Sequence, residues 1–356
     1  MSSKGVFADV CTRELELCGV GEGQTVAVLS AGDERLEYAD AFMSAAGRLG
    51  ATPYNVRLPE ASAASLDGGG GVGATPLTNN RPAVETLKRA DLLVDLVFML
   101  FSKEQLEIQE AGTRILLCIE PFENLVRLFP TADQRRRVEA SAKLLEKAST
   151  FRFTNRAGTD VTYQLGQYPV LMEYGFTDQP GRWDHWPAGF LLTGGADDGV
   201  NGRVVVDRGD IITIPFMRYV QDPMEFTIGS GRIQDISGGF DAEMLRDYMA
   251  SFDDDKAYGV AHIGWGCNEK SRWSQLGLEK ENRGLHMESM ACYGNVLFST
   301  GPNQELGGTN DTQCHIDMPM RNCSVFLDEE PVLIDGEFVI DDLKAERNSF
   351  MPAPVR

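Results

Sequence analysis

The stretch that decides the fold is Val26-Ala27-Val28-Leu29-Ser30-Ala31-Gly32-Asp33, a short apolar run followed by a polar turn. Residues Thr52–Leu58 form a second strand-like segment, and Gly50 before it stands where a helix C-terminus favours glycine. Between the two segments, apolar residues recur at helical spacing: Leu36, Ala39, Phe42, Ala46 and Leu49. Strand, helix and strand in this order indicate two parallel strands joined by a right-handed crossover.

The same alternation continues through the first 150 residues. Two more buried-type strands are expected at Leu92–Val97 and Arg114–Ile119, with a helix over Ser102–Ala111 between them. Thr131 and Gln134 form a capping box before a helix that runs to about Ala148. Residues 1–150 are therefore predicted to form an open parallel α/β domain.

The pattern changes after about Ser149, where glycine becomes frequent and one clear helix, around Met244–Phe252, interrupts the short strands. Gly229-Ser230-Gly231 is typical of a hairpin turn. The expected strands are Phe151–Thr154, Val161–Leu165, Arg203–Val206, Ile211–Ile214, Glu225–Ile228 and Arg232–Ile236. Residues 151–356 are predicted to form a mainly antiparallel α+β domain, so the fold class is α/β plus α+β.

The amino-acid composition excludes some classes of binding partner. The chain has 356 residues and a formal net charge of -20, from 33 Lys and Arg against 53 Asp and Glu. Without a basic stripe, nucleic acid and anionic membranes are poor partners. No apolar run reaches the roughly 18 residues of a membrane span, and the N-terminal residues lack the features of a signal peptide. The seven isolated cysteines are typical of reduced thiols, so we expect the protein in the cytoplasm. We also expect it to form a homo-oligomer.

Two local runs have plain interpretations. Gly68-Gly69-Gly70-Gly71-Val72-Gly73 lacks the Lys-Ser/Thr of a phosphate loop and is interpreted as a flexible loop. Arg135-Arg136-Arg137 is predicted to be a solvated helix face rather than a nucleic-acid patch.

The candidate chemistry centres on four histidines, all in the second half of the chain. His315 and Asp317 are two positions apart, so on a strand both side chains point to one face. Pro319 is expected to limit this strand on its C-terminal side. A second imidazole, for which we select His262, would complete the two-His, one-carboxylate set of non-haem Fe(II) oxygenases. The alternative is a core histidine hydrogen-bonded to a carboxylate.

A second candidate segment is Pro180-Gly181-Arg182-Trp183-Asp184-His185-Trp186-Pro187. Its aromatic and polar side chains suit a flat aromatic substrate, which needs stacking faces and a few orienting groups. A structural Trp-rich loop at an interface is the alternative. Cys314 is interpreted as an ordinary strand residue, and no serine nucleophile elbow is evident.

Taken together, these motifs resemble the 2,5-dihydroxypyridine 5,6-dioxygenase family of bacterial nicotinate degradation. The resemblance extends from about Gln24 to Asp328. It rests on Leu165-Gly166-Gln167-Tyr168-Pro169, the Trp183 segment, His262-Ile263-Gly264-Trp265-Gly266, Tyr293-Gly294-Asn295, Phe298-Ser299-Thr300-Gly301-Pro302-Asn303 and Cys314-His315-Ile316-Asp317. The family's fold is similar to that of aminopeptidase T-like metallopeptidases.

The resemblance implies one Fe(II) held by His262, His315 and Asp317. It also implies that the ring opens between C5 and C6 to give N-formylmaleamate, with both atoms of O2 incorporated. His185 and Glu173 are the expected catalytic residues. The expected substrate-binding residues are Leu100, Phe101, Arg182, Trp183 and Ser299.

One departure concerns the base. Family members carry a histidine in a Leu-Leu-His-Ser stretch, thought to act as the base, whereas this chain has Met99-Leu100-Phe101-Ser102. His185, Glu173 or water then takes the proton, or the substrate is a relative with different ionisation.

The alternative function is a two-metal aminopeptidase. His286 precedes Tyr293 by an interval that resembles one in the two-metal peptidases. His262, however, stands where we would expect such a peptidase to carry a glutamate.

Overall fold

The computed structural model describes residues 3–59, 72–73, 75–278 and 284–346. The chain divides into two compact units. The first comprises residues 1–130, 174–187 and 283–285, and the second comprises residues 131–173, 188–282 and 286–356. Most of the glycine run, Gly68–Gly71, lies outside the described residues.

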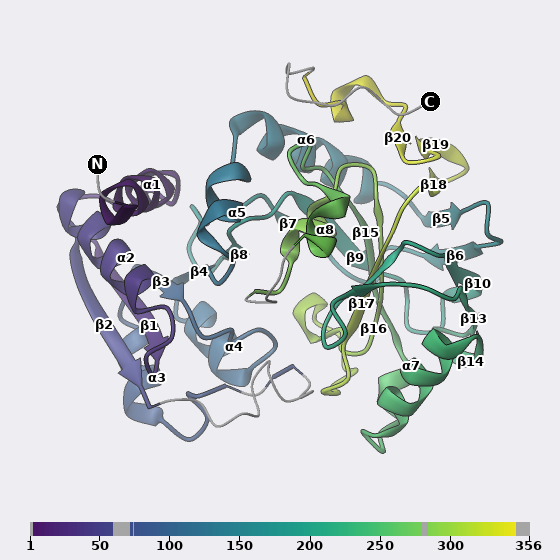
Figure 1. Cartoon of the computed structure of the whole chain (residues 1–356), viewed down its shortest axis with the longest axis horizontal. Coiled ribbons are helices and arrows are strands. Elements are labelled where there is room, and N and C mark those ends of the chain that lie inside the picture. The colour runs from purple at the N-terminus through teal and green to yellow at the C-terminus, as the bar shows by residue number, and fades with distance from the viewer. Residues whose placement is uncertain (1–2, 60–71, 74, 279–283, 347–356) are drawn as a thin grey trace. The chain divides into compact units, whose positions relative to one another are not determined.

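A five-stranded parallel sheet forms the centre of the first unit (Figure 1). Its order is β2-β1-β3-β4-β8, and every neighbouring pair is parallel. The strands are β1 (Thr25–Ala31), β2 (Thr52–Leu58), β3 (Leu92–Asp95), β4 (Arg114–Leu117) and β8 (Trp183–His185). The order reverses at β1 and β3, and ligands of open parallel sheets bind at the carboxyl ends of strands at such a switch point.

The helices of the first unit pack against the sheet or, as α1 does on α2, against one another. They are α1 (Ser3–Leu17), α2 (Leu36–Arg48), α3 (Arg81–Leu87), α4 (Lys103–Glu110) and α5 (Phe122–Arg127). Alternate strand residues such as Ala27 and Leu29 share one apolar cluster with Val84 of α3 and Ile108 of α4. Val28 points to the opposite face, and α2 packs against β1 and β2. Each fully buried aliphatic side chain stabilises the fold by roughly 1.5–3 kcal/mol.

The boundary between the units differs from the single boundary expected near residue 150. Helix α6 (Ala132–Leu145), capped by Thr131 as predicted, belongs to the second unit. Residues 174–187 return to the first unit, where β8 pairs with β4. Because β8 is only three residues long and lies among glycine and proline, it produces no period-2 pattern in the sequence.

The second unit contains two larger antiparallel sheets and a two-stranded ribbon, β11-β12. The eight-stranded sheet has the order β14-β13-β10-β6-β5-β18-β19-β20, and the five-stranded sheet has the order β17-β16-β15-β9-β7. The mainly antiparallel second half is thus confirmed, with two helices, α7 and α8, in addition to α6.

The bounds of the remaining elements are as follows. The strands are β5 (Thr150–Thr154), β6 (Asp160–Gln164), β7 (Leu171–Glu173), β9 (Phe190–Gly194), β10 (Val200–Val206), β11 (Ile211–Ile212), β12 (Arg218–Tyr219), β13 (Met224–Gly229), β14 (Arg232–Gly238), β15 (Val260–Gly266), β16 (Val296–Thr300), β17 (Ile316–Met320), β18 (Ser324–Leu327), β19 (Glu330–Ile334) and β20 (Glu337–Phe338). The helices are α7 (Phe240–Ala250) and α8 (Met287–Ala291), with short 3-10 helices at Asp255–Tyr258, Trp273–Gly277, Gln304–Leu306 and Asp341–Leu343.

Arg137 corrects one sequence prediction, because it is not part of a solvated face. Its side chain is fully buried on α6, forms ion pairs with Asp133 and Glu269, and donates a 3.0 Å hydrogen bond to the carbonyl of Cys267. Two carboxylates and a carbonyl replace the water that this guanidinium would otherwise bind, as a buried charge requires. A run of like charges therefore need not share one environment on a helix.

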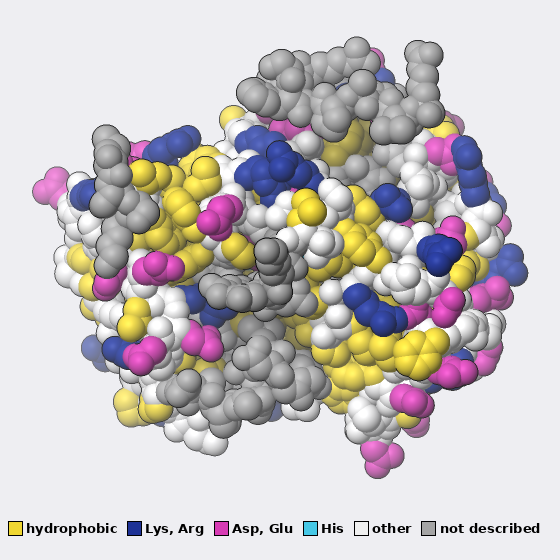
Figure 2. All heavy atoms as spheres, viewed as in Figure 1, with side chains coloured by type: hydrophobic (Ala, Val, Ile, Leu, Met, Phe, Trp, Pro, Cys, Tyr) yellow, Lys and Arg dark blue, Asp and Glu magenta, His cyan; other side chains and the backbone are white. Residues whose placement is uncertain are grey.

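The surface agrees with the composition. On the face drawn in Figure 2, basic and acidic side chains are interspersed, without a continuous basic band over the described residues. Within the described ranges, every helix is too short or too polar to cross a bilayer. All seven cysteines are buried free thiols, as their isolated positions suggested.

Candidate metal centre

The candidate metal ligands come from two strands of the five-stranded sheet, β15 and β17, which lie on either side of β16. His262 is in β15, Asp317 is in β17, and His315 comes directly before β17. All three are in the second unit. Asp317 pairs with Ser299 of β16 in the antiparallel register, so their side chains point to the same face.

Two imidazoles face the two oxygens of one carboxylate. The Nε2 atom of His262 lies 3.2 Å from Oδ1 of Asp317, and the Nε2 atom of His315 lies 3.2 Å from Oδ2. One donor atom from each residue lies within 4.8 Å of the other two. The sequence prediction that these three residues converge is therefore confirmed, and the donors suit one transition-metal ion.

The backbone of β15 explains how His262 reaches this position. The pairing of β15 with β16 shifts register between Val260 and Ile263, which places an irregularity at His262. Such bulges re-aim side chains near functional sites. On the other side, β15 approaches β9 so closely that a Cβ on Gly264 would overlap the carbonyl of Leu191.

Strand β17 corrects the expectation for Pro319. The strand does not end there but continues through Pro319 to Met320. It is the edge strand of its sheet, where the missing N–H of proline is tolerated. The amide and hydroxyl of Thr213 donate to the carbonyl of Asp317 at 3.0 and 3.1 Å, which fixes the backbone of this ligand.

Hydrogen bonding and charge prepare His315 and Asp317 for a cation. Nδ1 of His315 lies 3.2 Å from the carbonyl of Thr300, and donation to this oxygen leaves Nε2 as the electron-pair donor. Burial lowers the pKa of His315, but Asp317 raises it above the ordinary value. Burial raises the pKa of Asp317, but the two imidazoles hold it well below its usual range. The carboxylate is therefore ionised and partly compensated before any metal binds.

The other predicted site residues divide between the units. Glu173 and Ser299 are in the second unit with the metal ligands, whereas Leu100, Phe101, Arg182, Trp183 and His185 are in the first. The hydroxyl of Ser299 is buried without a hydrogen-bond partner among the described residues. Glu173 is half-buried at the end of β7. All four histidines are buried, and none appears on the face drawn in Figure 2.

His185 is a neutral imidazole at pH 7. It ends β8, pairs with Leu117 of β4, and stacks on the ring of Trp183 at a centroid distance of 5.7 Å. Burial lowers the pKa of His185 to about 4, although the neighbouring Asp184 acts in the opposite direction. A neutral imidazole can accept a proton, as the predicted role requires.

Arg182 is engaged inside the first unit. Its guanidinium pairs with Asp184 at 2.7 Å and lies 4.1 Å above the ring of Tyr174. Asp184 also accepts hydrogen bonds from the amides of Tyr174 and Gly175, each at 3.1 Å. These contacts fold the segment around Trp183, so Arg182 has a structural task whether or not it meets a substrate.

Phe101 lies in the turn between β3 and α4, with its side chain half-buried. Its φ is 63°, which is unusual for a bulky residue. Asp95 shapes this turn by accepting from the amides of Val97, Phe98 and Met99 at 2.8, 3.1 and 2.9 Å. Met99 belongs to the apolar cluster under the sheet, and Phe101 does not. The turn is at the carboxyl end of β3, beside the switch point.

His286 and Tyr293 are engaged by other groups. Nδ1 of His286 lies 3.1 Å from the hydroxyl of Ser289. The hydroxyl of Tyr293 donates to the carbonyl of Leu343 at 3.4 Å and accepts from the amide of Ala345 at 3.0 Å. These contacts give no support to a second metal at this pair.

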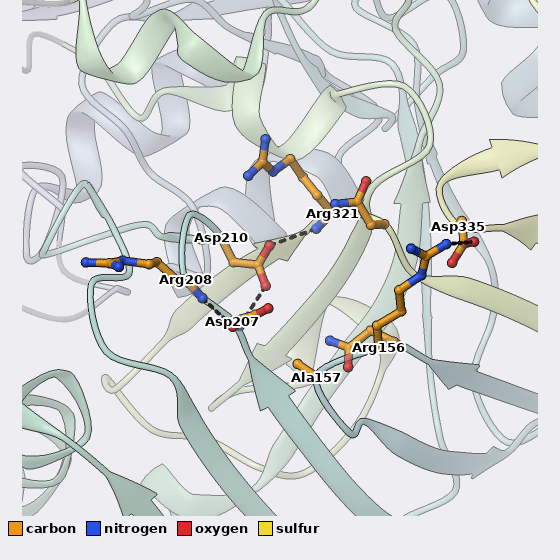
Figure 3. Close-up of a pocket in the computed structure, with 9 residues that line it drawn as sticks. Arg156, Ala157, Asp207, Arg208, Asp210, Arg321 and Asp335 are labelled. Atoms are coloured by element: carbon orange, nitrogen blue, oxygen red, sulfur yellow. Dashed lines mark hydrogen bonds and ion pairs between the residues drawn. The ribbon is translucent and has the colours of Figure 1, made fainter. Parts of the chain in front are cut away.

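A separate polar pocket of about 420 Å³ opens in the second unit (Figure 3). Arg156 pairs with Asp335 there, and Asp210 accepts from the amides of Asp207 and Arg321. Its lining residues are Asn155, Arg156, Ala157, Asp207, Arg208, Asp210, Arg321, Asn322 and Asp335. The set excludes the metal ligands, and its three arginines balance its three aspartates.

A further carboxylate, which sequence reasoning did not identify, interacts electrostatically with the candidate metal ligands. Glu305 lies in the 3-10 helix between β16 and β17, and both of its carboxylate oxygens are buried without a hydrogen-bond partner in the described part of the chain. Burial raises the pKa of Glu305, while His262 and His315 act to lower it. A single glutamate in an ordinary loop sequence carries no signal that would have identified it.

Comparisons with known proteins show the family of the chain. The protein-family model described as 2,5-dihydroxypyridine 5,6-dioxygenase matches residues 6–340 of this chain. A curated 2,5-dihydroxypyridine 5,6-dioxygenase of Pseudomonas putida is 46% identical over 328 residues, which cover 91% of this chain and 93% of that protein.

Solved structures confirm the fold. The 2,5-dihydroxypyridine dioxygenase of Pseudomonas putida KT2440 superposes with a TM-score of 0.92 at 43% identity, covering 97% of this chain and all (100%) of that one. AmpT from Thermus thermophilus superposes with a TM-score of 0.62 at 14% identity, covering 94% and 100% of the two chains. The second likeness concerns the fold alone.

Proposed function

The chain belongs to the 2,5-dihydroxypyridine 5,6-dioxygenase family, and we propose that it is an Fe(II)-dependent dioxygenase that opens a dihydroxypyridine ring. The expected reaction converts 2,5-dihydroxypyridine and O2 into N-formylmaleamate. The observation that carries this proposal is the buried carboxylate of Asp317 with an imidazole nitrogen 3.2 Å from each oxygen.

The donor set fits ferrous iron. Two imidazoles and one carboxylate on one side of an ion leave three coordination positions open, which is the usual arrangement of non-haem Fe(II) oxygenases. A closed structural zinc site would instead use four protein ligands. Nδ1 of His262 is buried without a hydrogen-bond partner among the described residues, whereas Nδ1 of His315 lies 3.2 Å from the carbonyl of Thr300.

The residues of the chain have distinct tasks in this proposal. His262, His315 and Asp317 would hold the ion, whose chemistry lets O2 react with the electron-rich ring. Ser299 points to the same sheet face as Asp317 and offers a hydroxyl for orienting the substrate. Glu173 and His185 stay candidate proton acceptors, and Leu100, Phe101, Arg182 and Trp183 stay candidate substrate contacts.

The aminopeptidase alternative has less support. It requires a second metal ion with further carboxylates, whereas His286 contacts the hydroxyl of Ser289 and Tyr293 contacts backbone groups. Its remaining basis is a fold shared at 14% identity. The cytoplasmic location and the homo-oligomeric state stay predictions from the sequence.

The decisive test combines oxygen uptake with isotope labelling. Anaerobically purified protein, loaded with Fe(II), is mixed with O2 and a panel of mono- and dihydroxypyridines. We expect uptake with a 2,5-dihydroxylated ring, two labelled oxygens from ¹⁸O2 in the product, and no need for NADH, flavin or a 2-oxo acid. Peptide hydrolysis without O2, together with no ring opening in air, would establish the aminopeptidase instead.

A further inference from the structure

Glu305 is a buried carboxylate that the metal ligands do not require. It follows β16 and precedes β17, the strands that carry Ser299 and Asp317. Neither of its oxygens has a hydrogen-bond partner in the described ranges. Burial raises the pKa of Glu305 and the imidazoles of His262 and His315 lower it, while Glu305 in turn raises the pKa of His315. The carboxylate is therefore within electrostatic reach of the metal centre.

The loop around Glu305 is held on both sides. The side chain of Asn303 accepts from the amide of Asn310 at 2.9 Å and donates to the hydroxyl of Tyr168 at 3.3 Å. The carbonyl of Asn303 also accepts from the amides of Leu306 and Gly308 at 3.1 and 3.0 Å. Leu306 is buried in the apolar cluster beneath the sheet. These anchors keep the intervening carboxylate inside the protein.

Such a group is costly unless it serves a ligand. Burial removes the hydration of the Glu305 carboxylate, and the charges of His262 and His315 and its own backbone amide offset this loss only in part. Glu305 is also outside the group of donor atoms that lie within 4.8 Å of one another, which comprises only His262, His315 and Asp317 in this unit. It thus interacts with the candidate metal ligands through its charge without belonging to the group of converging donor atoms.

We propose that Glu305 accepts the proton of the substrate hydroxyl when a hydroxypyridine binds at the metal centre. This role rests on the proposed function and names the base that the function needs. The substrate O–H bond breaks, its electron pair stays on the substrate oxygen, and a carboxyl O–H bond forms on Glu305. The ring becomes richer in electrons for its reaction with O2. The proton returns to the ring-opened product, so the overall reaction consumes none.

The test uses Glu305→Gln, which keeps the shape of the side chain and removes the proton acceptor. Turnover of 2,5-dihydroxypyridine at neutral pH should fall by about 100-fold or more, the range of one positioned acid or base. The loss should shrink as the pH rises, because the substrate then ionises in solution. Bound iron per chain should be unchanged. Glu305→Asp should restore part of the activity, because it restores the carboxylate.

Two readouts do not depend on activity. Under anaerobic conditions, the absorption spectrum of the bound hydroxypyridine should be that of the ionised form in the wild-type protein and of the protonated form in Glu305→Gln. The Tm of the metal-free protein should not fall in Glu305→Gln, because the amide keeps the shape of the side chain and carries no charge that must be buried. Gln304→Ala, in the same turn, is the matched control and should behave as the wild type in every assay.

Several results would overturn the role. Wild-type turnover and an ionised bound substrate in Glu305→Gln would exclude it as the base. Loss of iron would make it a ligand, and a lower Tm with an unchanged pH profile would make it structural. Failure of the wild-type protein to open any hydroxypyridine would refute the proposed function itself, and the role of Glu305 with it.

Discussion

Two buried histidines, one in each unit, each lie beside an aspartate, and their pKa values shift in opposite directions from the ordinary value. Burial lowers the pKa of His185 to about 4, whereas Asp317 raises the pKa of His315 above the usual value despite burial. The difference lies in what else the carboxylate binds. Asp184 is already engaged by Arg182 and three backbone amides, whereas each side-chain oxygen of Asp317 faces an imidazole nitrogen. The charge of Asp317 therefore raises the proton affinity of His315, whereas the charge of Asp184 is shared among other partners and raises that of His185 less than burial lowers it.

The largest expected effect is the loss of iron binding on replacement of Asp317, which distinguishes Asp317 from Asp184. Asp317→Asn should abolish iron binding and activity, because a three-residue ligand set has no spare donor. Iron per chain is measured after anaerobic loading, and turnover by O2 uptake. His262→Ala and His315→Ala should give the same loss. Full turnover by any of the three variants, or two fully occupied metals in the wild type, would refute the mononuclear centre.

Asp184→Asn should instead cost stability and leave iron binding intact. It leaves the guanidinium of Arg182 without its carboxylate partner, and breaking a buried ion pair costs about 3 kcal/mol. Urea denaturation of the metal-free protein measures the loss. Asp40→Asn, at an exposed position of α2, is the control and should stay within about 0.5 kcal/mol of the wild type. Loss of iron with unchanged stability would place Asp184 in the metal centre.

His185→Gln should lower turnover by at least about tenfold, if the imidazole orients or deprotonates the substrate. It should also alter the pH dependence of folding. Because the pKa of His185 lies near 4 in the folded protein and near 6.5 in the unfolded chain, the unfolded chain takes up the proton first as the pH falls. Wild-type stability should therefore be complete above about pH 6.5 and decrease toward pH 4. His185→Gln should lack this component, and an identical pH profile in the two proteins would contradict the assignment.

The sequence was sufficient where a local pattern determined the structure. The apolar spacing from Val26 to Leu58 predicted β1, α2 and β2, and the parallel sheet followed from their order. The two-residue spacing of His315 and Asp317 predicted that both reach one face, because side chains alternate along extended chain. Recognition of the third ligand, His262, depended on its apolar, glycine-rich surroundings, which the close pairing of β15 with β9 explains.

The features that escaped prediction depend on tertiary contacts. Strand β8 is only three residues long and exists because β4 offers it a parallel partner. Arg137 is buried because Glu269, more than a hundred positions away, meets its guanidinium. Glu305 is distinguished only by burial and by missing hydrogen bonds, and neither property is visible in a sequence. These positions escape prediction because local sequence preference carries little information about contacts between distant parts of the chain.

The smallest expected effect concerns Phe101, which tests whether the first unit can provide a titrating group. Phe101→His should leave iron binding unchanged and change Tm by no more than about 2 °C, because the side chain is outside the apolar cluster and histidine is more common than phenylalanine at positive φ. If the turn faces the substrate, the new imidazole should add an ionisation near pH 6.5 to the profile of kcat/KM. Phe101→Leu, which adds no titrating group, should keep the wild-type profile. A large loss of Tm in Phe101→His with an unchanged pH profile would instead identify this residue as core packing.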